Sequence, residues 1–165
     1  MKSVPIRGKN AQGMSFIVDD EDFENVSSVP WRLSRYGYVY RRQYIGTAGQ
    51  NKWRYKWITL HNYILGQPIK GMIDHIDGDK LNNSRENLRL TTHQQNIWNS
   101  KKSKTNTSGY VGVVWCATTN RWRATIYQDG QPINLGRFDT PQEAGFVYDQ
   151  FALQLRGEYA RLNML

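Results

Sequence analysis

At 165 residues, the chain is long enough for one or two compact folding units. Its formal net charge of +8 and isoelectric point near 9.7 favour an anionic partner, and nucleic acid is the usual one for a basic domain. The single cysteine, Cys116, excludes an intrachain disulfide and argues against a cysteine-based structural zinc site. The apolar runs are too short for a membrane span and no signal peptide is recognisable, so we expect a cytoplasmic protein without a membrane partner.

Residues 1–30 are polar and weakly patterned, with three basic and five acidic residues. Four of the acidic residues form a run from Asp19 to Asp22. Such a composition is typical of a solvated or loosely ordered segment. We therefore expect residues 1–30 to form a polar lead-in.

Residues 31–60 carry a β-strand pattern. Aromatic residues alternate with other residues along two stretches, and period-two alternation predicts strands. The loop at residues 46–51 would join these strands as a hairpin with one aromatic face and one basic face. The alternating aromatic residues are Tyr36, Tyr38 and Tyr40, followed by Trp53, Tyr55 and Trp57.

The positive charge of the chain is concentrated in residues 31–73, which hold eight basic and no acidic residues. Two interpretations are open: the charges simply face water, or the sheet lies along phosphates. The absence of acidic residues favours the second, because phosphate contacts scale with local basic residues. The candidate DNA contacts in this segment are Arg35, Arg41, Arg42, Lys52, Arg54 and Lys56.

Residues 58–66 predict a short helix that ends at Gly66 and carries His61. A lone histidine on a helix is more often structural than a ligand, so His61 is a minor catalytic candidate.

Residues 71–101 predict a strand, a turn, a returning strand and a helix. The strand covers residues 71–76, the turn contains Gly78, and residues 88–90 form the returning strand. Thr92 and Gln95 have the spacing of a capping box, so the helix should begin near His93 and reach about residue 101.

This segment also holds the residue types that phosphodiester hydrolysis requires. His75 can accept a proton near neutral pH, so it is the catalytic candidate. Asp74 and Asn96 offer oxygen ligands that suit a divalent ion, Mg²⁺ or Mn²⁺, which keeps several waters. Asn87 precedes the returning strand and is better placed to hold the loop or orient the imidazole than to react. His93 is the rival for a metal or phosphate contact.

Residues 101–109 are polar and read as a linker. Lys101 and Lys102 could equally touch phosphate, and both are retained as candidate DNA contacts.

Residues 110–165 predict a second unit of three strands and one helix. Thr140 and Glu143 form a second capping box around Pro141. The strand at residues 121–127 should place one set of side chains under the helix and the other on an open face. Six residues at helical spacing should form the apolar helix face, namely Ala144, Val147, Tyr148, Phe151, Ala152 and Leu155.

The second unit supplies the remaining candidate DNA contacts, and Arg121, Arg123, Thr125 and Tyr127 are expected on the open face of its sheet. Arginine pairs well with guanine edges and asparagine with adenine, although arginines that only touch phosphate remain the alternative. The candidates are Trp115, Arg121, Arg123, Thr125, Tyr127 and Asn134.

The stretches DHIDGDKLNN, ENLRLTT and QQNIWN resemble the HNH endonuclease motif of phage and intron-encoded homing endonucleases. The resemblance implies a ββα-metal fold in which His75 is the general base and Asp74 is a metal ligand. It places the central asparagine at Asn87 and the third motif position at Asn96. The segment from Trp31 to Arg42 resembles the β-rich module that often precedes this motif.

The stretches YVGVVW, NRWRATI and LGRFDT, with the helix that follows, resemble the DNA-binding domain of plant ethylene-response factors. The resemblance implies a three-stranded sheet, packed on one helix, that reads the major groove. Several arginines of the plant domains are missing, and Val111, Val114 and Asn134 stand near those positions. The target sequence of the plant proteins therefore does not carry over.

Together these features predict an α+β protein: a polar lead-in (1–30), an HNH nuclease domain with an N-terminal β hairpin (31–103) and a DNA-binding domain (104–165). The expected partner is double-stranded DNA in the bacterial host of a phage. We expect a monomer, with a dimer as the alternative. The alternative functions are a catalytically silent DNA-binding regulator and, from another class, a scaffold protein.

Overall fold

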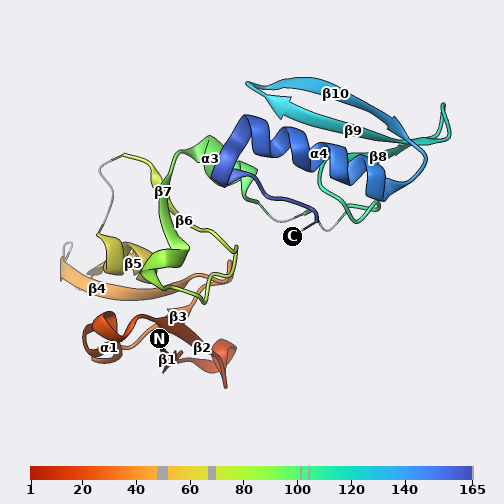
Figure 1. The fold of residues 1–165 in the computed structure, drawn as a ribbon. Coiled ribbons are helices and arrows are strands. Elements are labelled where there is room, and N and C mark those ends of the chain that lie inside the picture. Colours follow the sequence, from red (N-terminus) through yellow and green to blue (C-terminus); the bar gives the residue numbers. More distant parts are fainter. Residues whose placement is uncertain (48–51, 67–69, 101, 104, 165) are drawn as a thin grey trace. The chain divides into compact units, whose positions relative to one another are not determined.

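The computed structural model describes residues 1–47, 52–66, 70–100, 102–103 and 105–164, and shows an α+β fold built from small sheets (Figure 1). The chain divides into two compact units, Met1–Thr92 and His93–Leu165. This division differs from the expected boundary near residue 103. No helix in the described part of the chain has both the length and the apolar composition of a membrane span.

The first unit begins with an ordered β-hairpin and helix, which corrects the expectation of a loose lead-in. Strand β1 (Lys2–Pro5) pairs antiparallel with β2 (Ser15–Val18), and α1 (Asp20–Ser27) follows. A short 3₁₀ turn, η1 (Lys9–Ala11), lies between the strands. The polar composition conceals alternation: Phe16 and Val18 are fully buried. These two buried side chains anchor β2 in the core, because alternate residues of a strand point to the same face.

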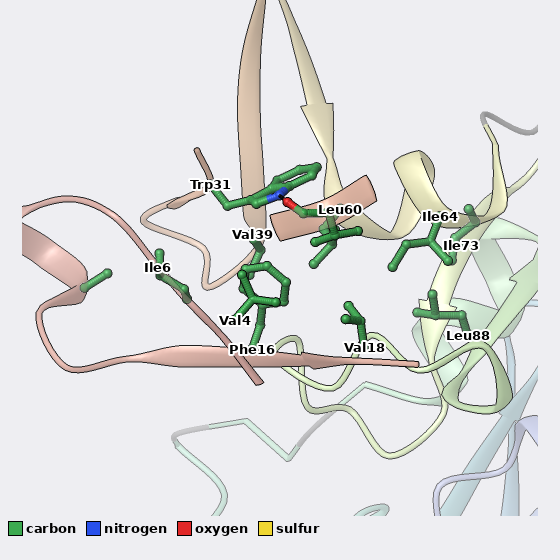
Figure 2. Packing of buried hydrophobic residues seen from close by; sticks show 12 residues of the cluster. Val4, Ile6, Phe16, Val18, Trp31, Val39, Leu60, Ile64, Ile73 and Leu88 are labelled. Carbon is green, nitrogen blue, oxygen red and sulfur yellow. Dashed lines mark hydrogen bonds between the residues drawn. The ribbon is translucent and has the colours of Figure 1, made fainter. Parts of the chain in front are cut away.

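Trp31 lies at the centre of the first core, where it is 1% exposed (Figure 2). Its ring meets those of Phe16 and Tyr63 edge-on, at centroid distances of 6.3 and 5.4 Å. Its indole N–H donates to the Val26 carbonyl at 2.8 Å. A buried tryptophan needs such a partner, and this bond also ties α1 to the core.

A three-stranded antiparallel sheet follows, in the order β3-β4-β5. Its strands are β3 (Arg32–Leu33), β4 (Val39–Thr47) and β5 (Trp53–Thr59). Tyr36 and Tyr38 were expected in a strand, but they lie in and just after a turn. Gly37 has φ +82° there and its N–H donates to the Ser34 carbonyl, a backbone geometry that favours glycine.

The rest of the first unit carries the motif residues. Helix α2 (Leu60–Leu65) begins two residues later than expected, because β5 continues through Thr59. Strands β6 (Met72–His75) and β7 (Leu88–Thr91) form a two-stranded antiparallel sheet, and the 3₁₀ turn η2 (Arg85–Asn87) leads into β7. The expected strand, turn and returning strand are therefore present.

The second unit contains the expected sheet and helix. It opens with α3 (His93–Trp98), which ends earlier than expected. The sheet, in the order β10-β9-β8, comprises β8 (Val113–Cys116), β9 (Arg121–Gln128) and β10 (Gln131–Phe138). Helix α4 (Pro141–Arg156) has the expected capping box, and the 3₁₀ turn η3 (Gly157–Tyr159) follows.

Helix α4 packs on the sheet through small residues as much as large ones. Ala144, Tyr148 and Ala152 are buried as expected, but Phe151 is 39% exposed. Gly145 is buried instead, and a Cβ there would approach the Tyr110 ring to 2.6 Å. Glycine at this position lets Tyr110 lie directly against the helix backbone, which apolar periodicity alone does not reveal.

Candidate functional site

Strand β6 directs its motif side chains to opposite sides. Ile73 and His75 are buried, 8% and 3% exposed, whereas Asp74 lies between them on the other face. This alternation follows from the two-residue period of a strand. The adjacent Asp74 and His75 therefore have different environments.

The environment of His75 assigns its tautomer. Its Nε2 lies 3.2 Å from Oδ1 of Asn83, whose Nδ2 donates to the Lys80 carbonyl at 3.1 Å. Because a carbonyl oxygen only accepts, Nε2 must carry the proton. In the neutral imidazole, Nδ1 is then the basic nitrogen. Asn83 is 1% exposed, and it had not been singled out in the sequence.

Aromatic rings surround the His75 imidazole. The His61 ring meets it edge-on with a centroid distance of 5.3 Å, and Tyr38 lies 6.3 Å away. Thr59 Oγ1 lies 2.9 Å from Nε2 of His61. Burial and the neighbouring His75 lower the pKa of His61 to about 4. His61, in α2, is therefore a neutral residue that packs beside His75.

Burial also lowers the pKa of His75 below its ordinary value, although the bond to Asn83 and the nearby Asp74 carboxylate oppose this shift. His75 is therefore a neutral imidazole at neutral pH, the form that can accept a proton.

Asn87 holds the loop between β6 and β7. Its Oδ1 accepts from the Asp77 backbone N–H at 3.0 Å, and its Nδ2 donates to Asp77 Oδ1 and to the Asn82 carbonyl. Burial alone would raise the pKa of Asp77, but bonds from Asp79 N–H, Asn82 and Asn87 lower it overall. The carboxylate therefore stays ionised and organises the turn. This arrangement supports the expected role of Asn87 in fixing the loop.

Asp74 faces an arginine across the sheet. Arg89 lies opposite Asp74 in the β6–β7 register, and its Nη2 donates to Asp74 Oδ2 at 3.3 Å. Both side chains are only about one-tenth exposed. Asp74 and Arg89 therefore form a largely buried ion pair.

The N-terminal segment supports the same loop. Ile17 on β2 donates to the Leu81 carbonyl at 2.8 Å and accepts from the Asn83 N–H at 2.9 Å. Arg85 donates to the Asp22 carboxylate through Nε and Nη2, both at 2.8 Å. The acidic run that had been read as solvated therefore contains an anchor for the loop. Local composition gave no signal of this contact, because it joins residues 63 positions apart.

The third motif position, Asn96, lies half-buried on α3 and belongs to the second unit. Its pairing with Asp74 therefore stays a prediction. Among the described residues, no group of three or more His, Cys, Asp and Glu side chains could by itself hold a metal ion. One carboxylate and one amide oxygen suit a hard ion that keeps water ligands.

The β4–β5 hairpin separates its side chains largely as expected. Directly paired residues share a face in an antiparallel sheet. The register therefore places Tyr44 opposite Tyr55 on one face, and Gln43 opposite Lys56 on the other. Arg41 and Arg54 lie with Lys56 on the second face, but Arg42 lies among the aromatic rings. Arg35 and Lys52 are exposed outside the strands.

Strand β9 confirms the expected division of the second sheet. Ala124 and Ile126 are fully buried, whereas Arg123 and Tyr127 are exposed. Arg137 lies opposite Arg123 in the register, so it shares the open face although it had not been selected. Arg121 forms an ion pair with Asp139 at 3.1 Å.

Three other candidates of the second unit require comment. Trp115 pairs with Trp122, and their rings lie 5.1 Å apart, so Trp115 is on the helix side and not on the open face with the arginines. Asn134 is exposed opposite Thr125 and accepts from the Gly136 N–H. Lys102 donates to the Gly109 carbonyl, and Lys101 lies outside the described residues.

Comparison with known proteins connects this site to a nuclease family. Residues 66–97 match the model of the HNH endonuclease family. An uncharacterized HNH endonuclease of Acanthamoeba polyphaga mimivirus is 34% identical over 112 residues, which cover 64% of the chain and 57% of that protein. APETALA2-like protein 2 of Oryza sativa subsp. indica is 37% identical over 60 residues, which cover 36% of the chain and 14% of the plant protein. The chain thus spans little more than half of the mimivirus protein and a small part of the plant protein.

A further relative is similar over most of its own length. Protein 3.8 of Escherichia phage T7 is 38% identical over 91 residues, which cover 55% of the chain and 74% of the phage protein. The chain therefore belongs to the family of phage T7 protein 3.8, and its residues 66–97 match the HNH endonuclease family model.

Proposed function

We propose that the protein is a divalent-metal-dependent DNA endonuclease of the homing type that hydrolyses phosphodiester bonds. The observation that carries this proposal is the neutral, tautomer-fixed imidazole of His75, which follows Asp74 in β6, where the Asp74 carboxylate pairs with Arg89. A general base must be unprotonated at working pH and held in one orientation. Asn83 orients the imidazole, and Asn87 holds the loop that follows it.

In this proposal, Nδ1 of His75 takes the proton from the attacking water. Asp74 and Asn96 would hold Mg²⁺ or Mn²⁺ in a ββα-metal arrangement, as the HNH resemblance implies. When bound, the divalent ion would neutralise the charge that grows on the phosphate and leaving oxygens. Asn87 acts by keeping the loop closed around Asp77 and does not react.

The two basic surfaces would hold double-stranded DNA. The hairpin face with Arg41, Arg54 and Lys56 contacts phosphates near the nuclease site. The open face of the second sheet forms a second DNA contact. A tethered second contact forms at high effective concentration, so it raises the affinity of the whole chain. Arg123 and Arg137 are the central charges of that second surface.

The experiment is cleavage of supercoiled plasmid with Mg²⁺, Mn²⁺ or EDTA, combined with a gel shift for binding. We expect metal-dependent cutting by the wild-type chain. His75→Ala and the larger His75→Gln should each lower the cleavage rate by about 10²-fold or more while retaining DNA binding. His93→Ala is the comparison, since His93 is the rival histidine. Full activity in both His75 variants, with loss of activity in His93→Ala, would show that His93 and not His75 is the general base.

One observation favours a second candidate function, a DNA-binding protein with a silent nuclease module. His75 is only 3% exposed, and a general base must be reached by water. This candidate predicts duplex binding in the gel shift and no cutting of plasmid with either metal. The same experiment therefore separates the two functions.

A further inference from the structure

One face of the β4–β5 hairpin consists of exposed aromatic rings, which we call the aromatic face: Tyr44, Trp53, Tyr55 and Trp57. Trp53 is 66% exposed and Trp57 60%, and the two tyrosines are 48% and 44% exposed. Tryptophan and tyrosine are usually mostly buried, because each carries a large apolar area. A contiguous group of exposed rings marks an interaction site.

The rings of the aromatic face contact one another in two groups. Tyr44 contacts both Trp53 and Tyr55, with ring centroids 5.3 and 6.0 Å apart. Trp57 stacks against Tyr40 at 4.7 Å with a tilt of 31°. The Arg42 guanidinium lies 5.2 Å from the centre of the Tyr55 ring. These mutual contacts order the rings on the hairpin surface without burying them.

The hairpin is not an extension of the core. Figure 2 shows Val39 and Leu60 among the buried residues, while the strands that they adjoin lead away from the cluster. Every residue of β5 from Trp53 to Trp57 is exposed. The rings are therefore unnecessary for the packing of the first core.

The charge around the aromatic face restricts its partner. Arg41, Arg54 and Lys56 lie on the opposite face, and residues 31–73 contain no acidic residue. A polyanion that also carries flat aromatic groups matches both features. Unpaired nucleic-acid bases present their π-faces to protein rings, whereas stacked duplex bases hide them.

We propose that the aromatic face stacks against unpaired bases of a DNA strand, either single-stranded or locally opened, while the positive charge of the hairpin attracts the phosphates of that strand. This inference deepens the proposed function by naming the form of DNA that the hairpin takes, and it rests on that function only for DNA as the substrate. Binding, and not cleavage, is the property that it determines.

The test compares two labelled strands of equal length and charge, oligo-dT and a strand of abasic residues, by fluorescence anisotropy in EDTA. Stacking contributes roughly 1–3 kcal/mol per base, so the wild-type chain should bind oligo-dT about 10-fold or more tightly than the abasic strand. The double variant Trp53→Ala/Trp57→Ala should lose most of this preference and retain its abasic-strand affinity.

Two control variants separate stacking from charge and from general exposure. Arg54→Gln/Lys56→Gln should weaken binding to both strands by the same factor. Phe146→Ala removes another exposed ring, 56% exposed on α4, and should change neither affinity. Folding of each variant is checked by its amide NMR spectrum.

Four outcomes would overturn the inference. Equal wild-type affinity for the two strands, or weak binding to both, would show that the face does not take bases. If the tryptophan variant lost affinity equally for both strands, the two rings would only maintain the shape of the hairpin and would not stack on bases. A wild-type dimer in sedimentation that the tryptophan variant loses would show that a second copy covers the face. Because no cutting is measured, an inactive nuclease would leave this result unaffected.

Discussion

Asn83 accepts a hydrogen bond from Nε2–H of His75 across 3.2 Å, and its own backbone N–H is held by Ile17 on β2. The orientation of the motif histidine therefore depends on a segment nearly sixty residues earlier in the sequence. Asn83, which positions the imidazole, is therefore not one of the three residues that define the HNH motif.

We expect Asn83→Ala to weaken the tautomer preference of His75, because the amide oxygen of Asn83 no longer faces Nε2. Asn83→Asp keeps an acceptor oxygen and should preserve it. The ¹⁵N shifts of the His75 ring at about pH 8 report which nitrogen carries the proton, since the imidazole is neutral there. Cleavage by Asn83→Ala should fall by about 10-fold or more, as for other partners that orient a functional imidazole. An unchanged wild-type ¹⁵N pattern in Asn83→Ala would contradict this role.

The pKa of His61, about 4 in the folded protein, predicts acid sensitivity of the first unit. A folded-state pKa below the unfolded value of about 6.5 contributes stability above pH 6.5, and this is lost as the pH falls toward 4. The loss should approach about 2 kcal/mol by about pH 5. Urea unfolding followed through the amides of β6 and β7 measures it.

The control for this prediction is His61→Gln, which keeps a polar side chain of similar size but does not titrate. The variant should be less stable at neutral pH and should lose less stability between about pH 7 and 5. Equal pH dependence in the two proteins would show that His61 is not the group responsible.

The acidic run provides a matched pair of variants. Asp22 is 8% exposed and binds Arg85, whereas Asp20 is exposed and forms an ion pair with the Met1 amino group at 3.1 Å. Asp22→Asn should lower the free energy of unfolding of the first unit by about 1–2 kcal/mol, because it weakens a charged hydrogen-bond pair. Asp20→Asn should change it by less than about 0.5 kcal/mol. Equal effects in urea unfolding would contradict an anchoring role.

The open face of the second sheet predicts a salt-dependent effect on duplex binding. If Arg123 and Arg137 each touch one phosphate, removing either should reduce the slope of log affinity against log salt by about 0.9. Arg121→Gln should have a smaller effect, because its guanidinium is already paired with Asp139. Titration of a labelled duplex at several salt concentrations measures these slopes. An unchanged slope in Arg137→Gln would exclude that residue from the contact.

The sequence correctly predicted elements whose signals are local. The capping box at Thr140, the alternation along β9 and the strand–turn–strand order around His75 all lie within a few residues of one another. Tyr36 was misplaced because alternation looks the same whether or not Gly37 turns the chain. The face on which Trp115 lies was not given by the sequence, because only its register with Trp122 determines it.

The sequence by itself determined the chemistry available to this protein: a histidine beside a carboxylate, asparagines at motif spacing, and a basic, aromatic hairpin segment without acids. Only the tertiary structure decided how that chemistry is held. Asn83, Ile17 and Arg85 act through contacts between distant segments, and such contacts leave no periodic or local pattern in the chain. The first unit therefore owes its ordered site to pairings across the fold, which burial and hydrogen-bond satisfaction select only when the whole unit is assembled.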